Sequence, residues 1–108
     1  MINYTDFSTS MGDDSDMIEM IIELYNEEHG DDIRVIQSQY ANQDLDGLFH
    51  TIHSLRGVLL TLCEEKATLQ LEIIENLCKH GKKPDVQLLD EALEEVARVN
   101  QQVLTLTV

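Results

Sequence analysis

The sequence predicts an all-α fold in which amphipathic helices pack as antiparallel neighbours. Apolar residues recur at three- and four-residue spacing along most of the chain, which is the period of one helical face. The chain has one proline and five glycines, and three of the glycines lie where these patterns start or stop. Short loops between helices favour antiparallel packing into a bundle. With 108 residues, 43% of them apolar, the chain can bury one modest core, so we expect a single domain over residues 1–108.

The first half of the chain predicts two helices that are separated by Gly30. The first begins with capping and acidic residues near Asp14, which suit a helix N-terminus. Its apolar face is predicted to consist of Met17, Met20, Ile21, Leu24 and Tyr25. The second helix is capped by Asp31 or Asp32. Its apolar stripe consists of Ile33, Ile36 and Tyr40.

The second half predicts three helices. A turn over residues 42–44 starts an apolar stripe, which consists of Leu45, Leu48, Phe49, Ile52, Leu55, Leu59 and Leu62. A polar connection over residues 63–66 leads to a helix from about Lys66 to His80, which ends in basic residues before a glycine. Pro84 suits the first turn of the last helix. That helix carries Leu88, Leu89, Ala92, Leu93, Val96, Val99, Val103 and Leu104. The β-prone tail over residues 104–108 is interpreted as a frayed helix end.

The composition disfavours several classes of function. Seven basic and 21 acidic residues give a net charge of −14, whereas binding to nucleic acid or to anionic membranes needs clustered Lys and Arg. No apolar run approaches the roughly 18 residues of a membrane span, and the N-terminus lacks a signal-peptide pattern. Cys63 and Cys78 show no metal-binding spacing and fit a reducing compartment. We therefore expect a cytoplasmic protein without membrane insertion, and Met1 and the lack of a linker favour a chain that stands alone.

The charge is unevenly distributed along the chain. Residues 1–50 hold twelve acids and one base, whereas five of the seven bases lie between residues 56 and 83. Such asymmetry indicates a face that meets a negatively charged partner, set in an otherwise acidic body. An ordinary solvated surface is the alternative.

The usual catalytic motifs are missing from the sequence. There is no phosphate-binding glycine loop, dinucleotide fingerprint, nucleophile elbow or zinc-protease helix motif, so no signature of a kinase is present. No histidine is preceded by a glutamate three residues earlier, which removes a di-iron bundle. His50 and His53 could chelate a metal, but the spacing places no third ligand. A metal or redox protein that uses these histidines and Cys78 stays an alternative.

His53 lies at the boundary between core and solvent on its helix. With Ile52 at the centre of the apolar stripe, His53 lies about 100° away from that centre. Gly57, one turn on, costs a helix about 1 kcal/mol relative to alanine, and its missing side chain opens the approach to the imidazole. Arg56 can bring its guanidinium to the same edge. This set suits an anionic group such as phosphoryl, and the alternative is a boundary histidine beside a packing glycine.

The next helix adds a carboxylate at the level of His53. If the turn between the two antiparallel helices is centred at residue 64, His53 and Glu75 each lie about 16 Å from it along their helices. Glu75 can then accept a hydrogen bond from Nδ1 of His53, which leaves Nε2 as the free nucleophile. Lys79, one turn from Glu75, adds a second cation. The alternative is that Glu75 is ordinary helix surface.

Residues 53–57, His-Ser-Leu-Arg-Gly, resemble the His-x-Leu-Lys/Arg-Gly motif of the histidine-phosphotransfer (HPt) family. The resemblance continues without gaps through the pair Ile74-Glu75 to Gly81, where the family has a Leu-Glu pair and then a glycine six residues later. It covers most of residues 16–105.

Two departures from the family pattern bear on the partner and on the turn after this helix. The family usually has small residues after the motif glycine, where this chain has Val58 and Leu59. It usually has a second glycine where this chain has Cys63. Neither departure removes a chemical group from the site.

The resemblance implies an antiparallel four-helix bundle with an additional N-terminal helix that acts as a phosphorelay intermediate. His53 would be phosphorylated on Nε2, Glu75 would orient the ring, and Gly57 would leave its approach open. Arg56 and Lys79 would face the phosphate as cations. The implied protein is a phosphoryl carrier and not an enzyme.

The resemblance also implies the partners. These are response-regulator receiver domains, a hybrid sensor kinase, or both. The receiver supplies the aspartate and Mg²⁺, so no cofactor is expected on this chain. The alternative function is a helical interaction module that binds receiver or kinase domains and modulates signalling without taking a phosphoryl group.

Overall fold

The computed structural model describes residues 1–106, which form six helices. Their bounds are α1 (Tyr4–Ser10), α2 (Ser15–His29), α3 (Asp32–Ala41), α4 (Leu45–Thr61), α5 (Lys66–Lys79) and α6 (Val86–Leu106). Within the described residues the only β contact is an isolated bridge between Ile2 and Glu64, so the predicted all-α class is confirmed. The predicted tail continues α6 as far as Leu106, and its last two residues lie outside the described part of the chain.

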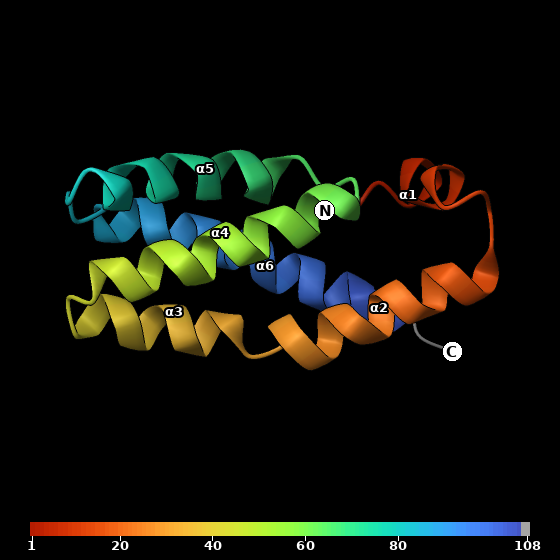
Figure 1. Cartoon of the computed structure of the whole chain (residues 1–108), viewed down its shortest axis with the longest axis horizontal. Helices are drawn as coiled ribbons and strands as arrows, with labels where there is room; N and C mark the ends of the chain where they lie inside the picture. The colour runs from red at the N-terminus through yellow and green to blue at the C-terminus, as the bar shows by residue number, and fades with distance from the viewer. Residues whose placement is uncertain (107–108) are drawn as a thin grey trace.

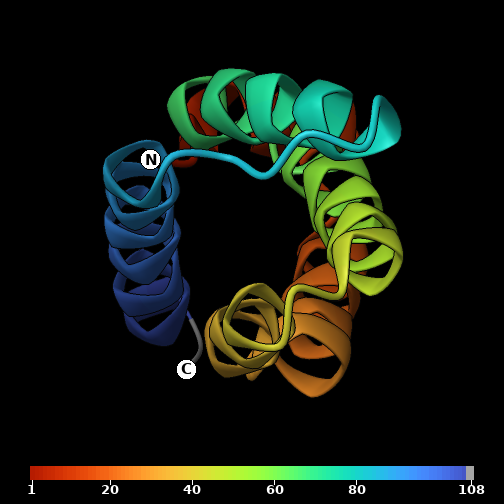
Figure 2. The same ribbon diagram turned by 90° about the vertical axis from the view of Figure 1, so that its left-hand side faces the viewer.

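Four antiparallel helices form the bundle, and the chain runs up and down through them in order (Figure 1). Seen end-on, α3, α4, α5 and α6 surround a shared core (Figure 2), and each packs on the next, with α6 returning to α3. Helix α2 continues the line of α3 and packs on α6. The molecule measures 41 × 20 × 19 Å, so α2 extends the bundle along its length.

The junction of α2 and α3 is held by a buried pair of side chains. Nδ1 of His29 lies 2.8 Å from a carboxylate oxygen of Asp32, and both residues are buried. Burial raises the pKa of Asp32, and the hydrogen bond to His29 offsets part of that shift. Asp31 occupies the N-cap position of α3 without a side-chain capping bond. Of the two predicted capping residues, Asp31 therefore takes the position, and Asp32 faces His29.

The predicted apolar face of α2 is confirmed for Tyr25, which is buried, and for Ile21, which packs against the core. It is wrong for its other three residues, because the helix is rotated about its axis. The buried residues of α2 are Ile18, Ile22, Tyr25 and His29. Met17, Met20 and Leu24, which we expected on the core side, are exposed. Tyr25 anchors the observed orientation, because its hydroxyl donates a hydrogen bond to Asn100 of α6 at 2.6 Å.

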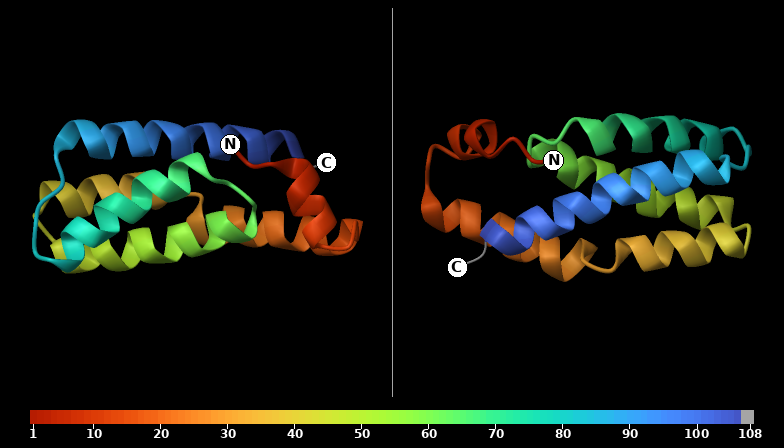
Figure 3. Two further views of the ribbon diagram at one scale, coloured as in Figure 1. Left: turned by 90° about the horizontal axis from the view of Figure 1, so that it is seen from above. Right: turned by 180° about the vertical axis from the view of Figure 1, so that it is seen from behind.

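Helix α1 was not predicted as a separate element from the periodicity of the sequence. Phe7 is its buried side chain. The segment before it is fixed by Gln102 of α6, whose amide accepts from Ile2 N at 2.7 Å and donates to Ile2 O at 2.9 Å. The backbone N–H of Asn3 donates to Cys63 O. Helix α1 therefore covers the end of the bundle opposite the α5–α6 connection (Figure 3).

The connection over residues 63–66, which was predicted to be polar, contains a buried acid. Oε1 and Oε2 of Glu64 accept the backbone N–H groups of Ala67 and Thr68 at 2.9 Å each. They therefore satisfy orphan donors at the start of α5. The N-terminal ammonium group lies 3.2 Å from Glu64 and 3.1 Å from Glu95. These partners explain how the fold tolerates a buried carboxylate here.

The α5–α6 connection ends one helix and leads into the next at the far end of the bundle. Gly81, with a φ of 71°, takes the left-handed conformation that often closes a helix. Pro84 lies two residues before Val86, the first residue of α6, rather than in the predicted first turn. Its carbonyl accepts the hydroxyl of Tyr40 at 2.7 Å, and Lys83 lies over the Tyr40 ring.

Cys63 closes α4 in the left-handed region, with a φ of 56°. A non-glycine residue there costs roughly 1–2 kcal/mol, partly offset by the greater unfolded-state freedom of glycine. We therefore expect Cys63→Gly to raise the free energy of unfolding by about 1 kcal/mol, measured by urea denaturation. Cys63→Ala removes the thiol but keeps the backbone conflict, so it should show no gain. Equal stability of the two variants would contradict this account of the turn.

Candidate functional site

The residues predicted for the site meet at one open groove between α4 and α5. Its lining consists of Phe49, His53, Arg56, Glu72, Ile73, Glu75, Asn76 and Lys79. Four of the predicted residues, His53, Arg56, Glu75 and Lys79, are in this lining. Gly57 follows Arg56 on α4. The groove therefore brings together two elements that are antiparallel and joined by one short turn.

His53 and Glu75 are paired across the groove. Nδ1 of His53 is hydrogen-bonded to Oε1 of Glu75, which is the contact that the predicted register of α4 and α5 requires. The His53 side chain is 59% exposed, whereas the Glu75 side chain is only 10% exposed. Because an ionised carboxylate can only accept, the pairing favours a proton on Nδ1 and a lone pair on Nε2.

Phe49 supports the imidazole from the preceding turn of α4. The two rings are stacked, with centroids 5.8 Å apart and an interplanar angle of 14°. Phe49 belongs to the predicted apolar stripe of this helix, but its contact with the imidazole was not predicted. The signal was present in the spacing, because residues i and i+4 lie on one helical face. The aromatic stack and the carboxylate together restrict the orientation of the ring.

Arg56 points at Glu75 rather than only at the open groove. Its Nε donates to Oε2 of Glu75 at 2.6 Å, so one carboxylate holds both the imidazole and the guanidinium. This ion pair compensates the largely buried charge of Glu75, which would be costly without partners. The resemblance implies that Arg56 also faces the phosphate. That role stays a prediction, and it would fall to the two terminal nitrogens of the guanidinium.

Lys79 is the groove cation without a carboxylate partner. It is exposed at the end of α5, it lines the groove, and within residues 1–106 it forms no ion pair. Its ammonium group is therefore available to an anion that approaches His53. The groove lining holds two cations, Arg56 and Lys79, and two acids, Glu72 and Glu75, so it is less acidic than the chain as a whole.

The remaining candidates lie outside the groove. Nε2 of His50 lies 3.5 Å from Asp46, and Cys78 is buried. The described part of the chain contains no group of three or more His, Cys, Asp or Glu side chains that could hold a metal ion. The two residues after Gly57 that depart from the family pattern do not line the groove, because Leu59 is in the core and Val58 packs against the core.

Gly57 is not required by packing within the chain. Apart from its chain neighbours and the nearby backbone of α4, no atom of residues 1–106 lies within 4 Å of the place that an added Cβ would take. We therefore expect Gly57→Ala to raise the free energy of unfolding by up to about 1 kcal/mol. The same methyl group would lie one turn from His53 and should slow phosphoryl transfer to a partner by about tenfold or more. Urea denaturation and transfer kinetics measure the two effects.

Ser54→Ala is the matched control for Gly57→Ala, because Ser54 is also exposed and adjoins His53 on α4. It should leave transfer unchanged. A stabilised Gly57→Ala protein that transfers at the wild-type rate would contradict the open approach.

The fold and groove together define a helical-bundle module that presents one of its exposed histidines, His53, in an open groove. Comparison with protein-family models matches the Hpt domain over residues 20–103. The chain belongs to the Hpt domain family. Searches of curated proteins and of solved structures give no match.

Membership of the Hpt domain family gives the general function and the kind of partner. Hpt domains are phosphocarrier modules rather than kinases. They serve phosphotransfer in two-component signalling, where their partners are receiver domains or kinases. Within residues 1–106, no helix combines the length and apolarity that crossing a bilayer requires.

Proposed function

We propose that this chain is a phosphorelay intermediate. It accepts a phosphoryl group on Nε2 of His53 from a receiver-domain aspartate or a sensor kinase, and passes it to the aspartate of another receiver domain. The observation that supports this most is the pairing of an exposed imidazole with a largely buried carboxylate. The proposal includes the cytoplasmic location expected from the composition.

The chemistry follows from the protonation of the ring. The lone pair on Nε2 attacks the phosphorus of an aspartyl phosphate, a P–N bond forms, and the P–O bond to the aspartate breaks. The carboxylate leaves with its electron pair, and the ring becomes positively charged. Glu75 stabilises that charge through Nδ1–H, as a carboxylate does for an imidazolium. Transfer onward is the same step in reverse with a second aspartate.

Phosphoryl transfer depends mostly on positioning and on stabilisation of charge. In this proposal Arg56 holds Glu75 in place through Nε, and Lys79 stabilises the phosphoryl oxygens. The partner receiver supplies Mg²⁺ together with its aspartate, so this chain needs no cofactor of its own.

The direct test is to identify the bond that forms. The chain is incubated with a receiver domain that carries phosphate on its aspartate, and the product is mapped by mass spectrometry. We expect an acid-labile, alkali-stable label on His53. A label on another histidine, or an alkali-labile label, would overturn the proposal. Stable binding without any label would establish the alternative, an interaction module.

Lys79→Glu tests whether the positive end of the groove guides acidic receivers. We expect transfer to slow by about tenfold, with most of the loss disappearing at high salt, because electrostatic steering is screened. Lys66→Glu makes the same charge change at the opposite end of α5. The transfer rates of both variants are measured from time courses, quenched at set intervals, at several salt concentrations. If the two variants slow transfer equally, net charge rather than the groove governs the encounter.

A further inference from the structure

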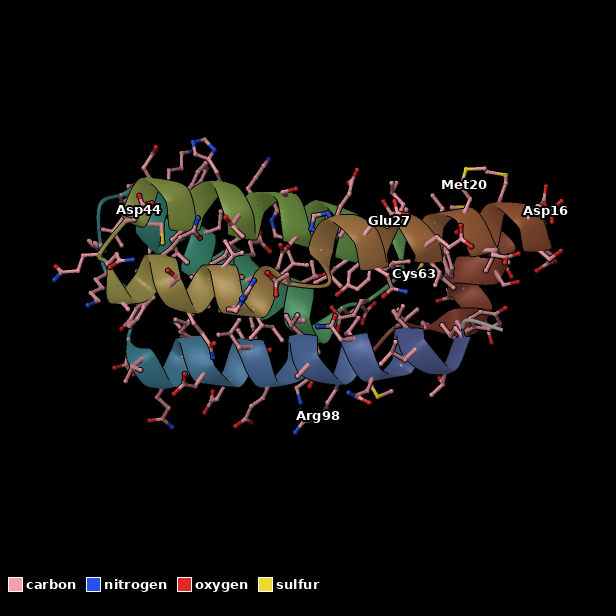
Figure 4. All side chains as sticks on the ribbon, turned by 90° about the horizontal axis from the view of Figure 1, so that it is seen from below. Asp16, Met20, Glu27, Asp44, Cys63 and Arg98 are labelled. Carbon is pink, nitrogen blue, oxygen red and sulfur yellow. The ribbon has the colours of Figure 1, made fainter. Side chains whose placement is uncertain are left out.

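Helix α2 carries three exposed apolar side chains that are not part of the bundle core. Met17, Met20 and Leu24 are 46%, 63% and 43% exposed. Their spacing of three and four residues places them on one helical face. We call this set the α2 stripe. Figure 4 shows Met20 on the side of α2 that faces away from α6, so the stripe is directed outward.

The α2 stripe has an acidic border. The exposed acids of the same helix are Asp16, Glu19, Glu23, Glu27 and Glu28. None of them forms an ion pair with any part of the chain that the structure describes. Asp16 and Glu27 lie on either side of Met20 along the helix (Figure 4). An unpaired acidic border around exposed methionines selects a partner by its charge.

The charges around the stripe argue against a second copy of this chain. Two copies meeting through α2 would bring the acids of one helix against those of the other, in a protein with a net charge of −14. Like charges that face each other across an interface cost free energy. The groove at His53 differs from this helix, because its lining holds two cations, Arg56 and Lys79, beside its two acids.

We propose that the α2 stripe docks a basic amphipathic helix of a partner protein. The apolar face of that helix would cover Met17, Met20 and Leu24, and its Lys or Arg residues would pair with the acids of α2. Methionine suits such a surface, because its flexible, polarisable side chain adapts to different apolar partners. This interaction surface is separate from the phosphoryl chemistry at His53.

The probe is a fluorescent 14-residue peptide of leucine and lysine with a helical amphipathic pattern. A peptide of the same composition in scrambled order has the same charge without an apolar face. Fluorescence anisotropy with the full chain is expected to show binding of the amphipathic peptide and about tenfold weaker binding of the scrambled one. The combined change Met17→Ser, Met20→Ser and Leu24→Ser should weaken amphipathic binding by about tenfold or more.

The matched control is Leu69→Ser, which removes a comparably exposed apolar side chain from α5 outside the groove. It should leave the affinity within about twofold, and circular dichroism verifies that every variant is folded. Equal binding by the triple variant, or an equal loss in the α5 control, would overturn the proposal. So would a dimer in sedimentation that the triple variant loses, because the occupant would then be a second copy. Uptake of label by His53 is measured in parallel and should be unchanged in the triple variant.

Discussion

The His53→Gln variant is expected to take up no acid-labile phosphoryl group from a phosphorylated receiver domain. Glutamine can still donate a hydrogen bond to Glu75, so the groove keeps its polar contact, but an amide nitrogen has no lone pair available for attack. Because His53 is largely exposed, the change should alter stability by less than about 0.5 kcal/mol. The loss of label should therefore be complete in a folded protein.

The measurement is the time course of label transfer, with wild type and His50→Gln run beside the variant. His50 is also exposed and lies on the same helix, but it faces Asp46 and not the groove. The His50→Gln variant should therefore transfer label at the wild-type rate. Retained label in His53→Gln would place the phosphoryl acceptor elsewhere in the chain.

Glu75→Gln is expected to slow phosphoryl transfer by about 100-fold. The amide keeps the shape of the carboxylate but loses its charge, so it stabilises the imidazolium less. It also leaves Arg56 without its ion pair. The resting imidazole should redistribute between its two tautomers, because a neutral amide can either accept from Nδ1 or donate to it.

Two readouts separate this effect from a structural one. Nitrogen NMR of His53 reports the tautomer ratio, which a merely destabilised fold would not change. Glu72→Gln removes a charge from the same groove, where Glu72 is exposed, and it should keep both the tautomer and the rate. If the two variants have the same tautomer ratio of His53 and the same transfer rate, Glu75 has no role in transfer beyond that of an ordinary surface residue.

The register of α4 and α5 could be predicted from the sequence because both helices are regular and their turn is short. A count from the turn centre was enough to place Glu75 level with His53, and the structure brings them into contact. The direction of Arg56 was not predictable in the same way. The long side chain of Arg56 can reach either the open groove or Glu75. Which of the two its guanidinium contacts depends on how deeply Glu75 is buried.

The rotation of α2 could not be predicted because apolar residues cover two sectors of that helix. Ile18 and Ile22 fit the helical period as well as Met17 and Met20 do. The contacts with α6, including the bond from Tyr25 to Asn100, decide which sector is buried. Glu64 was missed for a different reason. Acids are almost never fully buried unless paired, and its charged partner, the N-terminal ammonium group, lies far from it in the sequence.

The groove is built from one helical hairpin, with every lining residue between Phe49 and Lys79. The rotation of α5 relative to α4 about the helix axes is set by the few residues from Leu62 to Glu65. Surface loops usually tolerate an inserted or deleted residue. Here a single inserted residue would rotate α5 by about 100° relative to α4. The carboxylate of Glu75 would then lie roughly a quarter turn away from the imidazole of His53. The length of this loop is therefore constrained as strictly as the identity of the residues that it aligns.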